Sequence, residues 1–367
     1  MDVLFVTLTG HGHVTPTLAL VEELVGRGCR VRYATGGENA RAVVAAGARW
    51  VGLPGLPPFR PVGTGDRAVA EWFRHYFEAM RAVYPVLREH CLARRPDVIC
   101  YDATNWPARL VARELGVPAV RCLPHLASND SFTLPMPDEA HVVADDCARF
   151  AEEHGVELDV VGTVDAPERL NLVFLPREFQ PAGETFDATF HFIGPLLGRR
   201  ATEPWTPKHP DLPLLYVSLG SIMTDPAFHR ACLDAFADGA WQVALNAPAR
   251  ADAPANADVR DWFPQPSVLR HARAFVTHAG MNSTMEALHA GVPLVAAPRT
   301  PEQAANADRV QELGLGERLE HGGDLRAAVE RVAADRSIRR NLDRMREAVR
   351  AGGGAERGAG LILGVSR

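Results

Sequence analysis

Short apolar runs alternate with amphipathic segments along the first part of the chain. The runs at 3–8, 30–34 and 50–53 predict strands, and the segments at about 16–27 and 39–46 have the spacing of helices. Apolar strands that alternate with helices are typical of a parallel sheet covered by helices on both faces. The pattern therefore predicts an α/β fold with a doubly wound parallel sheet.

The same alternation resumes after a loop-rich region. Residues 97–101 and 119–122 predict two further strands, and PARLVARELG at 107–116 predicts the helix between them. The segments 54–75 and 123–140 are long, irregular and dotted with apolar residues. Loops of this kind beside strand ends commonly form a substrate pocket, and the alternative is a disordered surface.

A second set of apolar strands begins at residue 214. It comprises LLYVSLGS at 214–221, WQVALN at 241–246, ARAFVTHAG at 272–280 and PLVAAP at 293–298. Each is followed by a helical or loop segment, which predicts a second doubly wound domain. The stretch between the two sets, 195–213, is rich in proline, glycine and polar residues, as hinge linkers are.

These patterns divide the chain into two Rossmann-like domains. We assign residues 1–197 to an N-terminal domain, 198–212 to a linker and 213–350 to a C-terminal domain. The tail, 351–367, is expected to form a helix that packs back on the N-terminal domain.

The composition suits a chain with large cores and no nucleic-acid partner. The 367 residues are 47% hydrophobic, with a net charge of -6 and no basic tract that could neutralise phosphates. The N-terminal MDVLFVTLTGHGH lacks the basic region of a signal peptide, and no apolar run reaches the length that spans a bilayer. The six cysteines lack Cys-x-x-Cys spacing and suit reduced thiols. We therefore predict a cytoplasmic protein without membrane insertion.

The sequence FVTHAGMNSTMEALHAGVP concentrates polar residues where a strand turns into a helix. His278 ends the strand, Gly280 lets the backbone approach a ligand, and Asn282 or Ser283 is expected to cap the helix. A helix that begins at the carboxyl end of a parallel strand offers its N–H groups to an anion. Glu286 lies one turn further on. A carboxylate beside a phosphate is electrostatically unfavourable unless it accepts hydrogen bonds from neutral hydroxyls such as those of a ribose diol. The alternative is a capped helix with a solvated carboxylate.

Two neighbouring segments carry further polar and aromatic candidates. Glu302 and Gln303 open the helix after the next strand, where an acid and an amide suit the hydroxyls of a sugar. Trp262 and Gln265 lie on a proline-containing loop. An exposed tryptophan near a phosphate site suits stacking on a nucleobase, and the alternative is a core tryptophan.

These segments together resemble the nucleotide-sugar signature of the family 1 glycosyltransferases, most closely the bacterial macrolide type. The matching stretches are WFPQ at 262–265, HAGMNSTME at 278–286, GVP at 291–293 and Glu302-Gln303. Met281 departs from many plant relatives, which carry tryptophan there. The resemblance implies a GT-B fold, in which two Rossmann-like domains face a cleft. The C-terminal domain would bind the nucleotide sugar and the N-terminal domain the acceptor.

The resemblance also assigns roles to the donor-site residues. It implies that Trp262 stacks on the base, while Gln265 and Glu286 contact the ribose. The diphosphate would be held by residues of the turn and of a neighbouring strand end: Ser221, His278, Gly280, Asn282 and Ser283. Glu302 and Gln303 would bind the hydroxyls of the sugar.

The glycine-rich loop GHGHVTP at 10–16 does not fit a dinucleotide fingerprint. After Gly10 and Gly12 the third position is Thr15, and the second strand ends without an acid for a ribose. In the glycosyltransferase pattern the loop supplies a general base, which maps to His13, with His11 as a competitor. A free imidazole titrates near neutrality and can take a proton from an attacking hydroxyl.

Asp102 follows the predicted strand in VICYDATNWP, where the family keeps a carboxylate that orients this histidine. Its role would be that of the aspartate in a hydrolase triad, and the alternative is an N-cap of the helix near Trp106. The reaction would invert the anomeric centre. Because the sequence has no D-x-D motif and no cluster with metal-ligand spacing, we predict neither metal nor cofactor.

The implied reaction moves a sugar from a UDP- or dTDP-linked donor, with UDP-glucose favoured, to a hydroxyl of an apolar natural product such as a macrolide, polyketide or phenol. A dTDP-deoxysugar enzyme, a nucleotide-sugar epimerase, a catalytically silent partner protein and a nicotinamide oxidoreductase are the alternatives. The aromatic residues of 59–84 and 123–136 favour an apolar acceptor over an epimerase.

Overall fold

The computed structural model describes residues 1–7, 10–55, 59, 66–133, 142–159, 166–220, 225–249, 252–320 and 322–365. The chain forms two compact units. Unit 1 contains Met1–Phe174, Glu184–Leu196 and Gly353–Arg367, and unit 2 contains Leu175–Gly183 and Leu197–Gly352.

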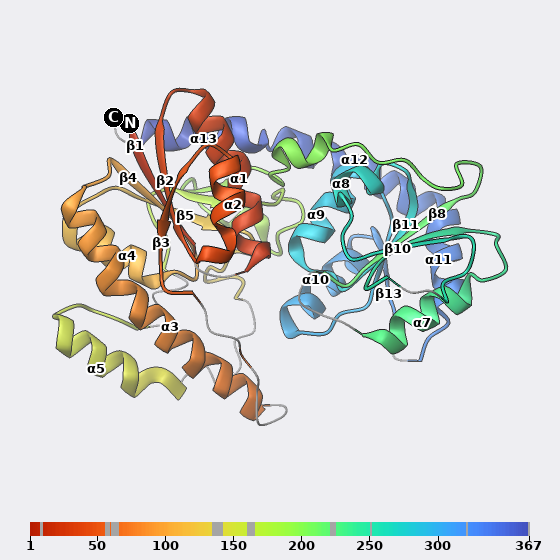
Figure 1. Ribbon diagram of the computed structural model, residues 1–367, viewed down its shortest axis with the longest axis horizontal. Coiled ribbons are helices and arrows are strands. Elements are labelled where there is room, and N and C mark those ends of the chain that lie inside the picture. The colour runs from red at the N-terminus through yellow and green to blue at the C-terminus, as the bar shows by residue number, and fades with distance from the viewer. Residues whose placement is uncertain are drawn as a thin grey trace. The chain divides into compact units, whose positions relative to one another are not determined.

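Unit 1 is built on a seven-stranded sheet in the order β3-β2-β1-β4-β5-β6-β7 (Figure 1). Every pairing between these strands is parallel. The strands are β1 (Asp2–Val6), β2 (Arg30–Thr35), β3 (Arg49–Gly52), β4 (Val98–Asp102), β5 (Ala119–Leu123), β6 (Asn171–Val173) and β7 (Phe190–Phe192).

Helices cover both faces of this sheet because its central strands are apolar on both sides. Val3 and Phe5 of β1 join a core with α1 and α13, while Leu4 and Val6 join a second core with α3 and α4. The helices of unit 1 are α1 (His11–Gly26), α2 (Ala40–Ala45), α3 (Asp66–Ala93), α4 (Trp106–Leu115), α5 (Ala144–His154) and α13 (Gly354–Gly364).

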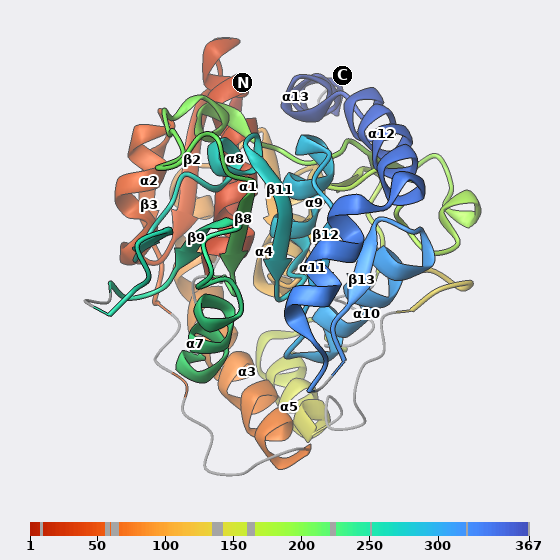
Figure 2. The same ribbon diagram turned by 90° about the vertical axis from the view of Figure 1, so that its right-hand side faces the viewer.

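Unit 2 contains a six-stranded parallel sheet in the order β10-β9-β8-β11-β12-β13 (Figure 2). Its strands are β8 (Leu214–Ser218), β9 (Gln242–Asn246), β10 (Ala257–Arg260), β11 (Ala272–Thr277), β12 (Leu294–Ala296) and β13 (Gly316–Arg318). Its α-helices are α7 (Pro226–Ala235), α8 (Gln265–Leu269), α9 (Met281–Ala290), α10 (Pro301–Glu312), α11 (Leu325–Ala334) and α12 (Arg336–Ala351).

The first strand and helix differ from the sequence prediction in a way that matters for the site. The strand ends at Val6, and α1 begins at His11, so that Pro16 lies inside the helix. Pro16 is the sixth residue of this helix, beyond the first turn, so the i→i−4 hydrogen-bond ladder lacks the N–H of this position. His13 therefore projects from the first turn of a helix and not from a loop.

The predicted linker and the predicted irregular segment also differ from the structure. Within 198–212, residues Gly198–Thr202 form a short 3₁₀ helix, η4. The Ser267 hydroxyl donates to the carbonyl of Glu203, and Trp205 contacts Phe263 edge to face, so this stretch is packed on unit 2. Residues 66–75, expected to be irregular, are the first turns of α3.

The C-terminal helix α13 closes one face of unit 1, beside α1 (Figure 1). Its Ala359 and Ile362 are fully buried in the core that contains Leu20. Gly358 permits this close approach, because a Cβ there would lie 2.6 Å from Leu20 Cδ2 and 3.0 Å from Ile193 Cδ1. No helix among the described residues has the length and apolarity that crossing a membrane requires.

Candidate active site

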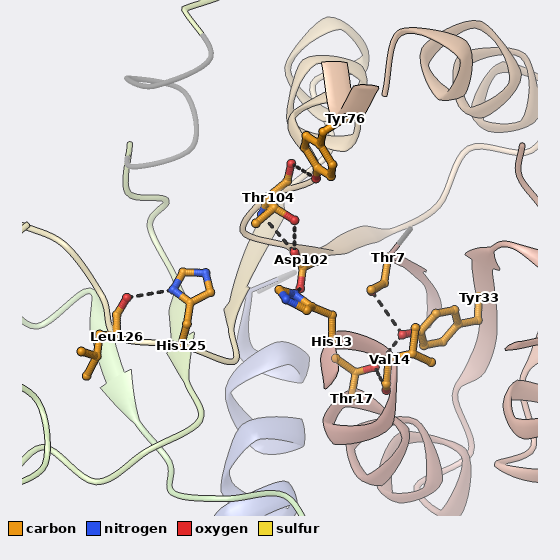
Figure 3. Close-up of polar contacts among 10 residues, drawn as sticks. All are labelled: Thr7, His13, Val14, Thr17, Tyr33, Tyr76, Asp102, Thr104, His125 and Leu126. Atoms are coloured by element: carbon orange, nitrogen blue, oxygen red, sulfur yellow. Dashed lines mark hydrogen bonds and ion pairs between the residues drawn. The ribbon is translucent and has the colours of Figure 1, made fainter. Parts of the chain in front are cut away.

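His13 and Asp102 meet at the carboxyl edge of the first sheet. Asp102 is the last residue of β4, His13 lies in the first turn after β1, and β1 and β4 are paired neighbours. His13 Nδ1 lies 2.6 Å from Asp102 Oδ2 (Figure 3). The aspartate side chain is 1% exposed and the histidine side chain 30% exposed. The pair therefore has a buried carboxylate end and an accessible imidazole end.

The second oxygen of Asp102 is fixed by the loop that follows β4. The backbone N–H of Thr104 donates to Oδ1 at 3.0 Å, and its hydroxyl donates at 2.5 Å. Burial by itself raises the pKa of the Asp102 carboxyl, but the charge and hydrogen bond of His13 and the bond from Thr104 outweigh it, and the net pKa is lowered. Asp102 is thus an ionised acceptor at neutral pH, and it selects the tautomer of His13 that carries its proton on Nδ1.

The capping alternative for Asp102 is wrong. Helix α4 is capped by Asn105, whose side-chain oxygen accepts from the backbone N–H of Ala108 at 3.2 Å. The Asp102 carboxylate instead forms hydrogen bonds with His13 and Thr104.

Three further residues shape this corner, and sequence reasoning missed them. Thr104 binds the carboxylate, and the Tyr76 hydroxyl donates to the Thr104 carbonyl at 2.7 Å. The His125 ring lies 6.4 Å from that of His13, centroid to centroid, and its Nδ1 is 2.8 Å from the Leu126 carbonyl (Figure 3). His125 follows β5, the neighbour of β4, so its place at the same sheet edge was the available signal.

In unit 2, the turn between β11 and α9 has an unusual backbone. Ala279 adopts φ 60°, a left-handed conformation that non-glycine residues rarely take and that is often found at functional sites. Gly280 is the N-cap of α9, and among the described residues no side chain caps this helix. The expectation that Asn282 or Ser283 is the cap is therefore wrong: both lie in the first turn. The uncapped N-terminus is the arrangement that anion-binding helices have.

The ring of His278 fits between two glycines. A Cβ on Gly280 would lie 2.4 Å from His278 Nε2, and one on Gly220 would lie 2.9 Å from Cε1. Burial lowers the pKa of His278, partly opposed by the nearby charge of Glu302. The imidazole is therefore neutral near pH 7 and can donate one N–H beside the helix end.

Glu286 is buried and bonded through both of its oxygens. Gln265 Nε2 donates to Oε2 at 2.8 Å and lies 3.1 Å from Ser283 Oγ. Arg200, in η4, pairs with Oε1 at 2.9 Å. The structure thus brings Gln265, Ser283 and Glu286 into one cluster, as the sequence indicated, and adds Arg200, which it did not.

The remaining candidates occupy the surface of unit 2. Trp262 is 62% exposed, which excludes the core alternative for this residue. Glu302 and Gln303 lie in the first turn of α10, where the backbone N–H of Gln303 donates to the capping Thr300 hydroxyl at 3.3 Å. Ser221 lies outside the described residues, as does the side chain of His11.

The strand-end turn is tied to the neighbouring helix. Asn306 of α10 donates through Nδ2 to the Ala279 carbonyl at 3.0 Å, and its side chain is fully buried. In the part of the chain that the structure describes, no group of three or more His, Cys, Asp or Glu side chains could hold a metal ion.

Known proteins resemble this chain over most of its length. The family model for UDP-glucoronosyl and UDP-glucosyl transferase matches residues 213–348. NDP-glycosyltransferase YjiC of Bacillus subtilis (strain 168) is 36% identical over 378 residues, which cover 97% of this chain and 95% of the relative. The chain belongs to the family 1 glycosyltransferases.

Further relatives place the glycosyltransferase among enzymes of natural-product metabolism. Demethyllactenocin mycarosyltransferase of Streptomyces fradiae is 36% identical over 397 residues, which cover 98% of this chain and 86% of the relative. The solved structure of CalG4, the calicheamicin glycosyltransferase, is 36% identical with a TM-score of 0.88, covering 99% of this chain and 98% of that one.

These comparisons confirm the predicted GT-B fold and the predicted enzyme class. The glycosyltransferase is of the macrolide and natural-product type, and transfer with inversion is general in its family. The oxidoreductase, epimerase and silent-partner alternatives are set aside.

Proposed function

We propose that the glycosyltransferase moves a hexose from a nucleoside diphosphate donor, with UDP-glucose favoured, to a hydroxyl of an apolar natural product. The observation that carries the proposal is the 2.6 Å contact between His13 Nδ1 and the buried Asp102 carboxylate. With Nδ1 bonded to Asp102, we assign the role of proton acceptor to Nε2.

The chemical step follows from this geometry. The acceptor hydroxyl gives its proton to His13 Nε2 while its oxygen attacks the anomeric carbon. The bond from that carbon to the nucleoside diphosphate breaks on the opposite side, which inverts the centre. Asp102 stabilises the imidazolium without taking the proton itself, as in other His–Asp pairs.

The leaving group would be bound by the turn at 278–283. The uncapped N-terminus of α9 and the neutral His278 offer N–H donors to the diphosphate, and their fixed orientation needs no reorganisation as charge develops. Gln265 and Glu286 would contact the ribose, and the exposed Trp262 would stack on the base. Ser221 would assist at the diphosphate.

The sugar and the acceptor are assigned from the remaining residues and from the relatives. Glu302 and Gln303, at the start of α10, would bind sugar hydroxyls, which favours a hexose with free hydroxyls. The names of two relatives, a demethyllactenocin mycarosyltransferase and a calicheamicin glycosyltransferase, support a natural-product acceptor. A deoxysugar linked to dTDP stays the second candidate for the donor. We propose that no metal or cofactor takes part and that the enzyme acts in the cytoplasm.

The test is a transfer assay with UDP-glucose or dTDP-glucose and a panel of macrolide and phenolic acceptors, run with and without EDTA. Product mass is followed for the wild type, His13→Ala and His11→Ala. We expect a gain of one hexose that falls about 10²- to 10⁴-fold in His13→Ala and persists in His11→Ala. Loss in His11→Ala alone would assign the base to His11, and loss on adding EDTA would overturn the metal-free mechanism.

A further inference from the structure

Arg200 occupies a position that the proposed function leaves unexplained. Its guanidinium is 2.9 Å from Glu286 Oε1, the carboxylate expected to receive the ribose hydroxyls. The Glu286 side chain is 4% exposed, and that of Arg200 is 35% exposed. The protein therefore already supplies a charged donor to one oxygen of this carboxylate.

The backbone that presents Arg200 is anchored. The chain just after η4 is held by the bond from Ser267 to Glu203 and by the edge contact of Trp205 with Phe263. Opposite Arg200, Gln265 donates to Oε2 and receives a hydrogen bond from the Tyr216 hydroxyl at 3.3 Å. Both oxygens of Glu286 thus have a protein donor held in place by further contacts.

This arrangement changes how the donor site responds to a nucleotide that lacks a ribose hydroxyl. A site whose buried acceptor depends on a ligand hydroxyl rejects analogues that lack it, because the acceptor is then left unpaired. Arg200 satisfies Oε1 whatever the ligand carries. Its positive charge also offsets the repulsion between Glu286 and a nearby diphosphate.

We propose that Arg200 stands in for a ribose hydroxyl at Glu286, so that the donor site accepts 2′-deoxyribonucleotides as readily as ribonucleotides. This inference rests on the proposed function, because it requires Glu286 to face the ribose. A sugar linked to either a ribonucleoside or a 2′-deoxyribonucleoside diphosphate can then serve as the donor, and Arg200 is the residue that sets this tolerance.

The experiment compares binding of UDP and 2′-deoxy-UDP by calorimetry, a pair that differs in one hydroxyl. The wild type should bind both within about threefold. In Arg200→Ala, Oε1 depends on the ligand, and 2′-deoxy-UDP should weaken relative to UDP by about 10- to 100-fold, the value of one hydrogen bond to a charged group. Arg200→Lys keeps a charged donor and should restore most of the tolerance.

The matched control is Arg199→Ala, which removes the same charge from the exposed neighbour on η4 and should leave the ratio of the two affinities unchanged. Thermal unfolding of each variant checks that it is folded. If Arg200→Ala weakens both nucleotides equally, or the wild type already rejects 2′-deoxy-UDP tenfold, the inference is overturned while the donor site stands. If neither nucleotide binds the wild type, the proposed donor site itself is wrong.

Discussion

At the scale of single residues, catalysis is expected to depend on which nitrogen of His13 carries the proton. In Asp102→Asn, the new side chain could turn its amide toward Nδ1 and donate to it, which would place the proton on Nε2 and remove the base. The substitution should therefore lower kcat by up to about 10⁴-fold, with little effect on the KM for the donor. Initial rates at saturating acceptor measure this change.

The control for this variant is a substitution at Tyr76, which hydrogen-bonds to Thr104 and not to Asp102 itself. Tyr76→Phe removes the hydroxyl that donates to the Thr104 carbonyl but keeps both bonds from Thr104 to Asp102. Its loss of activity should stay well below that of Asp102→Asn. Equal losses would mean that the loop as a whole, and not the carboxylate charge, supports His13.

The glycine beside His278 offers a test of the donor site. In Gly280→Ala the new Cβ would meet the imidazole at 2.4 Å, and because a side chain can move more cheaply than backbone, the ring should be displaced. We expect UDP to bind about tenfold more weakly, as for one lost hydrogen bond to a charged group.

Gly26→Ala serves as the comparison, because nothing lies within 4 Å of a Cβ at that position in α1. It should bind UDP normally and gain up to about 1 kcal/mol in the free energy of unfolding. Normal UDP binding by Gly280→Ala would show that the imidazole takes no part in holding the diphosphate.

At the scale of elements, helix α13 contains a pair of glycines with opposite expected effects. A methyl group at Gly358 would press on the fully buried Leu20, and overpacking of this kind costs about 1–3 kcal/mol. Gly360 is exposed, and an alanine there would meet only an arginine side chain at 3.6 Å. Gly358→Ala should thus lower the free energy of unfolding and Gly360→Ala raise it by about 0.5–1 kcal/mol.

Urea unfolding of the two variants measures both the expected decrease and the expected increase in the free energy of unfolding. If Gly358→Ala proved as stable as Gly360→Ala, the tight contact between α13 and α1 would be contradicted. Transfer activity should fall in Gly358→Ala and stay unchanged in Gly360→Ala. The reason is that His13 belongs to the first turn of α1, the helix against which α13 packs.

The elements that were predicted from sequence are those with long apolar runs. Strands β1, β8 and β11 lie inside their sheets and β2 pairs with β1, and all four are almost continuously buried, so their apolar runs stand out in the sequence. The missed strands have only three or four residues each, too few to show an alternation: β6, β7, β10 and β13.

The start of α3 was missed for a different reason. The proline- and glycine-rich stretch before residue 66 suggested a loop, and that interpretation was extended too far along the chain. The buried residues of α3, Phe77, Met80, Tyr84 and Leu87, recur every three or four positions, which is the helical signal. The signal was present in the sequence but began later than the helix.

The candidate site was predictable to the extent that its residues follow strands. Asp102 is the last residue of β4, His278 directly follows β11, and His13 lies in the first turn of the helix after β1; parallel topology gathers such positions at one edge of a sheet. Arg200 was not predictable, because its contact with Glu286 joins a short 3₁₀ helix to a distant α-helix. Periodicity carries no information about such a pairing.

At the scale of the whole molecule, three histidines make stability depend on pH. Burial is the main cause that lowers the pKa of His90, His278 and His289, and neighbouring arginines add to it at His90 and His289. Below the unfolded-state pKa of about 6.5 the unfolded chain binds more protons than the folded one, so the free energy of unfolding falls as the pH drops toward the folded-state values.

Urea midpoints at pH 7.5 and 5.5, at constant ionic strength, measure this effect. The midpoint should be lower at pH 5.5, and His289→Gln should reduce the difference without touching the proposed donor site. Equal midpoints in the wild type would contradict the lowered pKa values.

The path of the chain through its two units sets an order for its synthesis. Unit 1 is interrupted after Leu196 and is completed only from Gly353 onward, whereas the residues of unit 2 end at Gly352. At about 5–20 residues per second, a ribosome needs roughly 10 to 30 seconds to make the intervening stretch. During that time α13 has not yet been made, so the side of α1 that carries Leu20 is not covered by it. The newborn protein therefore completes the residues of unit 2 first, and unit 1, which carries His13, is completed last.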